Sequence, residues 1–164
     1  MRADMHKGFG GLLEAYQERI YWHLRRLLGS HDDASDAMQE TFIRIFRNFD
    51  SFKGDASSFT AWVFKIATNE AMRMIERRPE PSLSLEDAGS QPLADEYVDY
   101  TDLEAVKLQK AILALPPRQR AVFNMRYYDE MSYQEIADAT DTSLSAVKVN
   151  YHLAKEKIVN AIKS

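Results

Sequence analysis

An acidic, proline-containing run, residues 79–106, divides this chain of 164 residues into two parts. The run holds eight acidic residues, no lysine or arginine, and three of the chain's five prolines. Proline ends helices, and a segment this polar buries too little apolar surface to offset the entropy lost on ordering. We therefore expect two small domains, 8–78 and 102–162, joined by an acidic flexible linker at 79–101. The alternative is one domain with a long loop, which compact domains seldom contain.

Both parts show apolar residues at intervals of three and four, the spacing of helices with one buried face. Ile20, Leu24 and Leu27 follow this spacing in the first part. The last predicted helix, about 143–162, has an inner stripe of Leu144, Val147, Tyr151, Ala154 and Ile158. No stretch alternates apolar and polar residues as a half-buried strand does. The predicted fold class is all-α.

Charge is distributed unevenly, and this bears on the partners that the chain can bind. The net charge is −4 overall, but residues 1–78 carry +1, residues 79–106 carry −8 and residues 107–164 carry +3. A pI near 5.6 would argue against nucleic-acid binding by one uniform domain. Because the acids are concentrated in the middle, the two flanking domains remain compatible with nucleic acid.

Several function classes are excluded by what the sequence lacks. There is no cysteine, so disulfides, cysteine-ligated metals and thiol nucleophiles are excluded. The four histidines are scattered without metal-ligand spacing, and no phosphate loop or dinucleotide motif is present. We expect no catalytic residue, no metal and no cofactor, so the chain is not predicted to be an enzyme. It has no membrane-spanning run and no secretory signal, and the expected location is the cytoplasm.

The C-terminal part contains the pattern of a helix-turn-helix. Ser132 and Glu135 form a capping box at the start of one helix, and a break at 140–142 separates it from the last helix. Asp141 stands where the turn usually has glycine, and aspartate tolerates a left-handed backbone better than most residues do.

The outer face of the last helix is the candidate DNA-reading surface. In a helix-turn-helix, the first turns of this helix enter the major groove, where lysine can reach guanine and asparagine can pair with adenine. A solvated helix face is the alternative, and the helix-turn-helix context favours DNA. The candidate residues are Ser145, Lys148, Val149, Asn150, His152 and Lys155.

Two further clusters lie in the N-terminal part. Asp36, Gln39, Glu40 and Ile43 share one exposed face of the second predicted helix, which fits a basic protein partner as well as plain solvent. A polar loop beyond this helix is flanked by four aromatic residues and accompanied by cationic and amide side chains, a combination used to bind single-stranded nucleic acid. We expect Phe49 and Phe59 to be core residues and Phe52 to be the stacking candidate, near Trp62, Lys53, Lys65 and Asn69.

These stretches resemble a known family, the bacterial RNA polymerase sigma factors. Region 2 of that family is matched by DASDAMQETFIRIFRNFDSFKGDASSFTAWVFKIATNEAMRMIERR. Region 4 is matched by LPPRQRAVFNMRYYDEMSYQEIADATDTSLSAVKVNYHLAKEKI. The short layout with only a linker between them is similar to the extracytoplasmic-function (ECF) subfamily, and the resemblance covers about residues 8–162.

The resemblance implies a role for each cluster. The face with Asp36, Gln39, Glu40 and Ile43 would bind the clamp helices of core RNA polymerase. The second set would capture a flipped base of the promoter -10 element and face the melted strand; it comprises Phe52, Lys53, Gly54, Asp55, Lys65, Asn69 and Arg73. Region 4 would read the -35 element and touch the polymerase flap. The acidic linker would follow the RNA-exit path, and an anti-sigma protein is a further expected partner.

Two departures from the family pattern change these expectations. Asn150 and Leu153 stand where the last helix commonly has arginine, so phosphate affinity should be weaker and the promoter sequence cannot be carried over. Met72 stands where an aspartate is common. The expected function is a promoter-specifying initiation factor. The alternatives are a free-standing dimeric helix-turn-helix regulator and an interaction-only protein that occupies polymerase without reading DNA.

Overall fold

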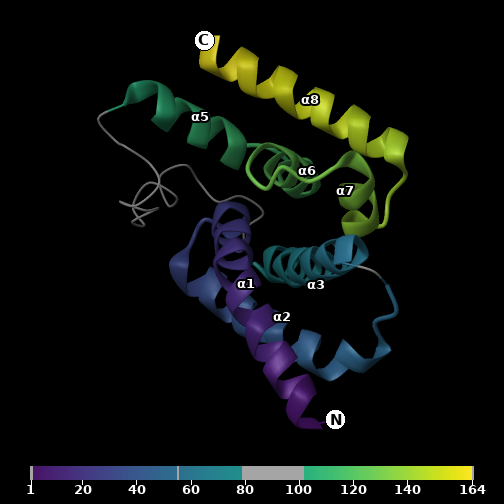
Figure 1. Cartoon of the computed structure of the whole chain (residues 1–164). Helices are drawn as coiled ribbons and strands as arrows, with labels where there is room; N and C mark the ends of the chain where they lie inside the picture. The colour runs from purple at the N-terminus through teal and green to yellow at the C-terminus, as the bar shows by residue number, and fades with distance from the viewer. Residues whose placement is uncertain (1, 55, 79–101, 164) are drawn as a thin grey trace.

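The structure is a computed structural model that describes residues 2–54, 56–78 and 102–163, and every regular element in these ranges is helical (Figure 1). This confirms the predicted all-α class. Asp55 and the linker 79–101 were both part of the sequence predictions, and they lie outside the described residues. None of the described helices is both long and apolar enough to cross a membrane.

Three helices and one short turn make up the N-terminal part: α1 (Arg2–Leu28), α2 (His31–Asn48), the 3-10 turn η1 (Phe49–Ser51) and α3 (Ala56–Arg77). Gly29, with φ 81°, ends α1 in the left-handed conformation that glycine adopts most easily. Ser30 then caps α2, and its Oγ accepts a hydrogen bond from the Asp33 amide at 3.3 Å. This tight connection lets α1 and α2 pack as neighbours.

Four helices make up the C-terminal part: α5 (Leu103–Leu113), α6 (Pro117–Tyr127), α7 (Tyr133–Thr140) and α8 (Leu144–Lys163). The predicted capping box is present, since Ser132 Oγ accepts from the Glu135 amide and Glu135 Oε1 accepts from the Ser132 amide. Asp141 has φ 53° and ends α7 in the left-handed region, as the sequence indicated. The pair α7 and α8 is the helix-turn-helix.

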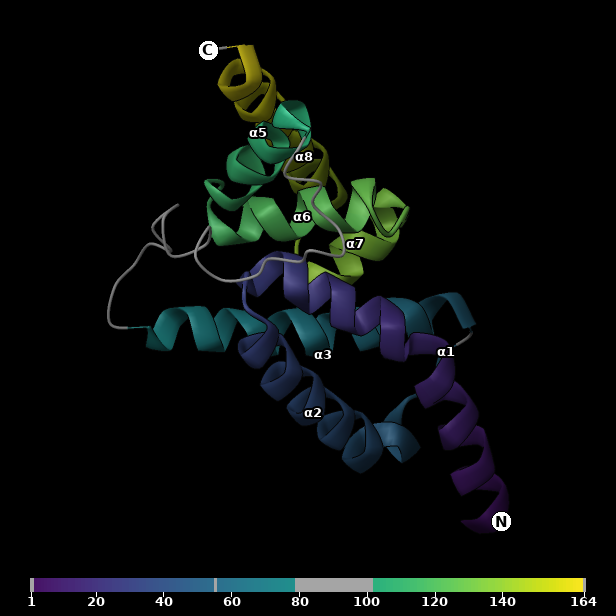
Figure 2. The same ribbon diagram turned by 90° about the vertical axis from the view of Figure 1, so that its left-hand side faces the viewer.

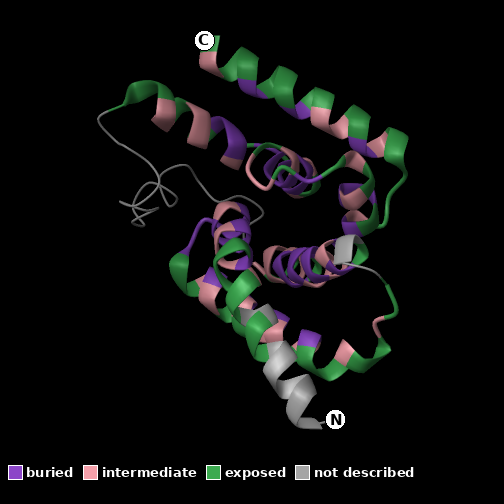
Figure 3. Ribbon diagram, viewed as in Figure 1, coloured by how far each residue is buried: buried purple, intermediate pink, exposed green. Residues whose placement is uncertain are grey.

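The two parts pack directly against each other in the described structure. Helix α3 lies along α7, and the C-terminal half of α1 lies against α6 (Figures 1 and 2). One hydrophobic cluster contains side chains from both parts and accounts for the buried stripe along their junction (Figure 3). Its members include Ile20, Leu24, Phe64, Ala67, Val122, Met125, Ile136 and Ala137.

A second cluster lies entirely within the C-terminal part and joins α5, α6 and α8. Val147, Ala154 and Ile158 of the predicted α8 stripe are buried and Tyr151 is half-buried. Leu144 is 39% exposed, so its predicted core position is wrong. It is the first residue of α8, and a helix end is covered by fewer neighbouring elements than its middle.

Candidate polymerase and nucleic-acid interfaces

The predicted protein-binding face of α2 is accessible in the structure. Asp36, Gln39 and Ile43 are exposed, and Glu40 is half-buried beside them. Phe46, one turn beyond Ile43, is 53% exposed and extends the same face, although sequence reasoning did not include it. Its spacing of three residues from Ile43 was the available signal. Exposed apolar side chains next to acids are typical of a surface that a protein partner covers.

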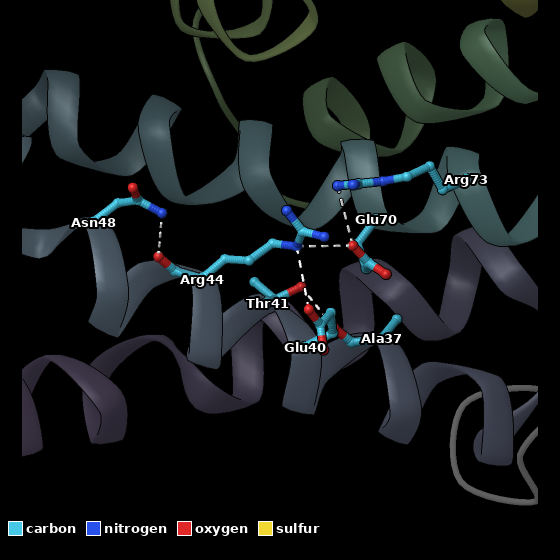
Figure 4. A network of polar contacts seen from close by, with 7 residues as sticks. All are labelled: Ala37, Glu40, Thr41, Arg44, Asn48, Glu70 and Arg73. Carbon is cyan, nitrogen blue, oxygen red and sulfur yellow. Dashed lines mark hydrogen bonds and ion pairs between the residues drawn. The ribbon is translucent and has the colours of Figure 1, made fainter.

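A chain of alternating charges connects this face of α2 to α3 (Figure 4). The Arg44 Nε atom lies 3.4 Å from Glu40 Oε1 and 3.2 Å from Glu70 Oε2, and Glu70 Oε2 is 3.1 Å from Arg73 Nη2. We call these four residues the Glu70 network. Their spacings along each helix, four and three residues, are visible in the sequence. The link between the two helices appears only in the folded chain, so Arg44 and Glu70 were missed.

The aromatic loop, residues 49–54, packs on the start of α3. The Phe52 ring is 5.2 Å from the Phe59 ring and 5.1 Å from the Trp62 ring between centroids. Phe59 is buried, whereas Phe52 and Phe49 are half-buried. Phe52 therefore rests against its neighbours with part of its ring accessible, and Lys53 beside it is exposed.

Gly54 makes the tight path of this loop feasible. A Cβ atom at this position would lie 2.7 Å from Phe52 Cζ and 2.7 Å from Ser58 Cβ, closer than real side chains approach. A larger residue would therefore displace the Phe52 ring or the first turn of α3. The glycine of the predicted base-capturing set is thus required for the position of its aromatic neighbour.

The predicted strand-facing residues of α3 lie next to the helix-turn-helix. Lys65 Nζ donates to Asp141 Oδ1 at 2.9 Å, across the junction of the two parts. Asn69 is exposed at the rim of a small pocket whose lining also includes Thr142 and Asn150 from the other part. Arg73, two positions before Ile75 on the same helix, belongs to the Glu70 network instead of this pocket.

The recognition helix α8 presents most of its predicted DNA-reading residues to solvent. Ser145, Lys148, Val149, His152 and Lys155 are exposed. Asn150 is the exception, because it is half-buried and faces α3 through the pocket. Five of the six predicted residues are thus accessible together on α8.

A buried polar contact at the junction was not anticipated from the sequence. The His23 side chain is fully buried, with Nε2 2.9 Å from Thr68 Oγ1 and Nδ1 3.8 Å from Asp129 Oδ2. Burial, with Arg26 and Arg19 nearby, lowers the pKa of His23 to about 3, so its imidazole is neutral at pH 7. Burial also raises the pKa of Asp129 to about 6, although Arg26 and Arg19 oppose that shift.

The chemistry of the described residues supports binding rather than catalysis or metal chemistry. No group of three or more histidine, aspartate or glutamate side chains in the described ranges could hold a metal ion. The perturbed pair, His23 and Asp129, lies inside the junction, where a substrate has no access. What remains on the surface is one acidic-apolar helix face, one aromatic loop and one helix-turn-helix.

Comparison with known proteins agrees with this arrangement. Residues 12–79 match the family described as sigma-70 region 2, and residues 105–158 match sigma-70 region 4. The chain is 32% identical over 162 residues to the ECF RNA polymerase sigma factor SigW of Bacillus subtilis, covering 92% of this chain and 86% of that protein. It is 27% identical over 168 residues to the ECF RNA polymerase sigma-E factor of Haemophilus influenzae, covering 95% and 88%.

One solved structure supports the fold across both parts. The sigma factor RpoE from Bartonella quintana, co-crystallised with the anti-sigma factor NepR, superposes with a TM-score of 0.73 and 22% identity. The match covers 96% of this chain and 98% of that one. Both parts of the chain therefore have counterparts in one protein of known structure.

Proposed function

The chain belongs to the ECF family of RNA polymerase sigma factors and directs promoter-specific transcription, and we propose that it does so through three surfaces. The exposed face of α2 binds the clamp helices of core polymerase. The aromatic loop and α3 engage the -10 element during melting, and the outer face of α8 reads the -35 element. The observation that carries this proposal is the presence of all three surfaces on one chain.

The polymerase contact is assigned to Asp36, Gln39, Glu40 and Ile43. The first two and Ile43 are exposed, and the apolar contribution of Ile43 is extended by Phe46. An interface of this kind gains affinity from the apolar side chains and specificity from the carboxylates. A dimeric helix-turn-helix regulator has no use for this face or for the aromatic loop, which disfavours that alternative.

The DNA contacts divide into two steps. Lys148, Val149 and their neighbours on α8 can meet base edges of an intact duplex, because they are exposed near the start of the recognition helix. Phe52 can stack a base only after that base has left the duplex. Lys53, Gly54, Asp55, Asn69 and Arg73 accompany Phe52 in this second step, together with Lys65.

We further propose that the chain supplies recognition and strand opening and makes or breaks no covalent bond itself. Its partners are core polymerase, at the clamp helices and the flap, and promoter DNA in the cytoplasm. An anti-sigma protein is a further proposed partner, since RpoE of Bartonella quintana was crystallised with one.

The direct test is reconstitution with core RNA polymerase. Run-off transcription on a library of genomic fragments should yield discrete transcripts that depend on the added chain, and the isolated chain should bind the same fragments weakly. The reason is charge: the residues outside the acidic run total only +4, and phosphate affinity scales with the number of counterions released. Specific nanomolar binding by the chain alone would favour a free-standing regulator instead.

A further inference from the structure

Glu70 is the buried member of the Glu70 network. Its side chain is 8% exposed, whereas those of Glu40, Arg44 and Arg73 are 38–40% exposed. A carboxylate withdrawn from water needs cationic partners, and Glu70 has one on each side. Arg44 reaches it from α2 and Arg73 from the next turn of α3, at 3.2 and 3.1 Å (Figure 4).

The geometry leaves Arg73 fixed at one end and accessible at the other. Its Nη2 atom faces Glu70, and a guanidinium has further N–H donors in a rigid plane. Arg73 follows Asn69 by four residues, so both lie along one side of α3. A donor held in place before its ligand arrives loses less conformational entropy on binding.

We propose that Glu70 is a positioning residue for promoter opening: it holds Arg73 oriented toward the backbone of the melted strand without touching DNA itself. This inference rests on the proposed function, in which α3 faces that strand. The competing explanation is that Glu70 only ties α3 to α2 through Arg44. The two explanations differ in which arm of the network matters for DNA.

The test uses holoenzyme and a pre-melted template made from a promoter that the wild-type holoenzyme transcribes. The variants are Glu70→Gln, Arg73→Ala, their double mutant, and Arg44→Gln as the matched control that breaks only the arm to α2. Template affinity is measured over a series of KCl concentrations, because one lost phosphate contact on a single strand lowers the salt slope by about 0.7. Core polymerase affinity and melting temperature are measured for each variant.

We expect Glu70→Gln to weaken template binding by about threefold to tenfold, the size expected for releasing one immobilised side chain. Its salt slope should fall toward that of Arg73→Ala, and the double mutant should bind no more weakly than Arg73→Ala alone. Arg44→Gln should keep the wild-type slope. Additive effects of Glu70→Gln and Arg73→Ala, tighter binding by Glu70→Gln, or an equal loss in Arg44→Gln would each overturn the proposal.

A second variant covers the case in which Glu70→Gln does not fold. Arg73→Lys keeps the charge and leaves Glu70 in place, but an ammonium drawn to Glu70 has no planar fork to present outward. It should therefore lose the same salt slope as Arg73→Ala, and a wild-type slope would contradict the proposal. If Arg73→Ala itself binds normally, the inference fails while the sigma function, tested by transcription of the parent promoter, stands.

Discussion

Lys65 on α3 and Asp141 in the turn of the helix-turn-helix form a 2.9 Å ion pair that joins the two parts of the chain. Lys65 belongs to the set proposed to face the melted strand, and Asp141 immediately precedes the segment that leads into the recognition helix. A DNA phosphate that approaches Lys65 must therefore displace Asp141. In the described structure, the residues proposed for strand opening and for duplex reading are not independent.

The first prediction separates the charge of Asp141 from its backbone conformation. The pair is largely exposed, and such pairs are worth roughly 0–1 kcal/mol, so Asp141→Asn should lower the free energy of unfolding by no more than that. Asp141→Ala should cost about 1–2 kcal/mol more, because alanine pays for the left-handed φ of 53°. Urea unfolding measures both values. Asp141→Gly is the control, since glycine lacks the charge and adopts this φ freely; equal losses in the Asn and Ala variants would contradict the argument.

The second prediction concerns pH and the buried pair His23 and Asp129. The folded pKa of His23 is about 3, below its ordinary 6.5, so the unfolded chain binds the extra proton and acid destabilises the fold between those values. The folded pKa of Asp129 is about 6, above its ordinary 3.8, so the folded chain binds that proton and acid has the opposite effect. The two contributions to the pH dependence oppose each other between about pH 4 and 6.

Removing either group should therefore expose the contribution of the other. In Asp129→Asn, the free energy of unfolding should fall as pH drops below about 6.5, by up to about 1.4 kcal/mol per pH unit relative to wild type. In His23→Gln, it should rise relative to wild type as pH drops from about 6 to 4. Urea titrations at several pH values give these slopes. Parallel pH profiles for all three proteins would show that the pair does not titrate as stated.

The third prediction tests the polymerase-binding face without disturbing the Glu70 network. Asp36→Arg with Ile43→Arg changes two exposed side chains and leaves Glu40 in contact with Arg44. A charge left unpaired at an interface costs about 2–5 kcal/mol, so co-purification with core polymerase should be lost while helicity is unchanged. Glu18→Arg, an exposed acid on α1, is the control and should still co-purify. Retained binding by the double mutant would remove α2 from the interface.

How far the sequence alone predicts this molecule depends on the range of the interactions. The helices, the capping box at Ser132 and the left-handed Asp141 follow from local rules of spacing and backbone conformation, and all are present. Contacts between distant segments leave no local pattern. The pairing of His23 with Asp129, the ion pair of Lys65 and the burial of Glu70 all depend on how α1 and α3 meet other helices.

The proposed sites show the same division. Exposure of Asp36, Gln39 and Lys148 could be predicted because each lies opposite an apolar stripe on its own helix. The half-burial of Asn150 could not, because it is α3 of the other part that covers it. Exposure of Phe46 was likewise missed, since a phenylalanine on an amphipathic helix is expected to face the core.

The last prediction assigns Lys148 and Phe52 to different steps of initiation. Lys148 is exposed in the first turns of α8, where a lost base contact costs about 1–3 kcal/mol, so Lys148→Ala should weaken closed complexes on linear duplex. Phe52 is half-buried against Phe59 and Trp62, and its accessible part can stack a base only after unpairing. Phe52→Ala should spare closed complexes and reduce the permanganate reactivity of unpaired thymines.

A pre-melted template distinguishes the two steps. It should restore transcription by Phe52→Ala holoenzyme, because the cost of unpairing has been removed, and should leave Lys148→Ala impaired wherever the upstream element is required. Melting temperature is the control, since the Phe52 ring also packs on α3. If the bubble rescues neither variant, or if Phe52→Ala unfolds the N-terminal part, then Phe52 acts as a core residue and the aromatic loop does not capture a base.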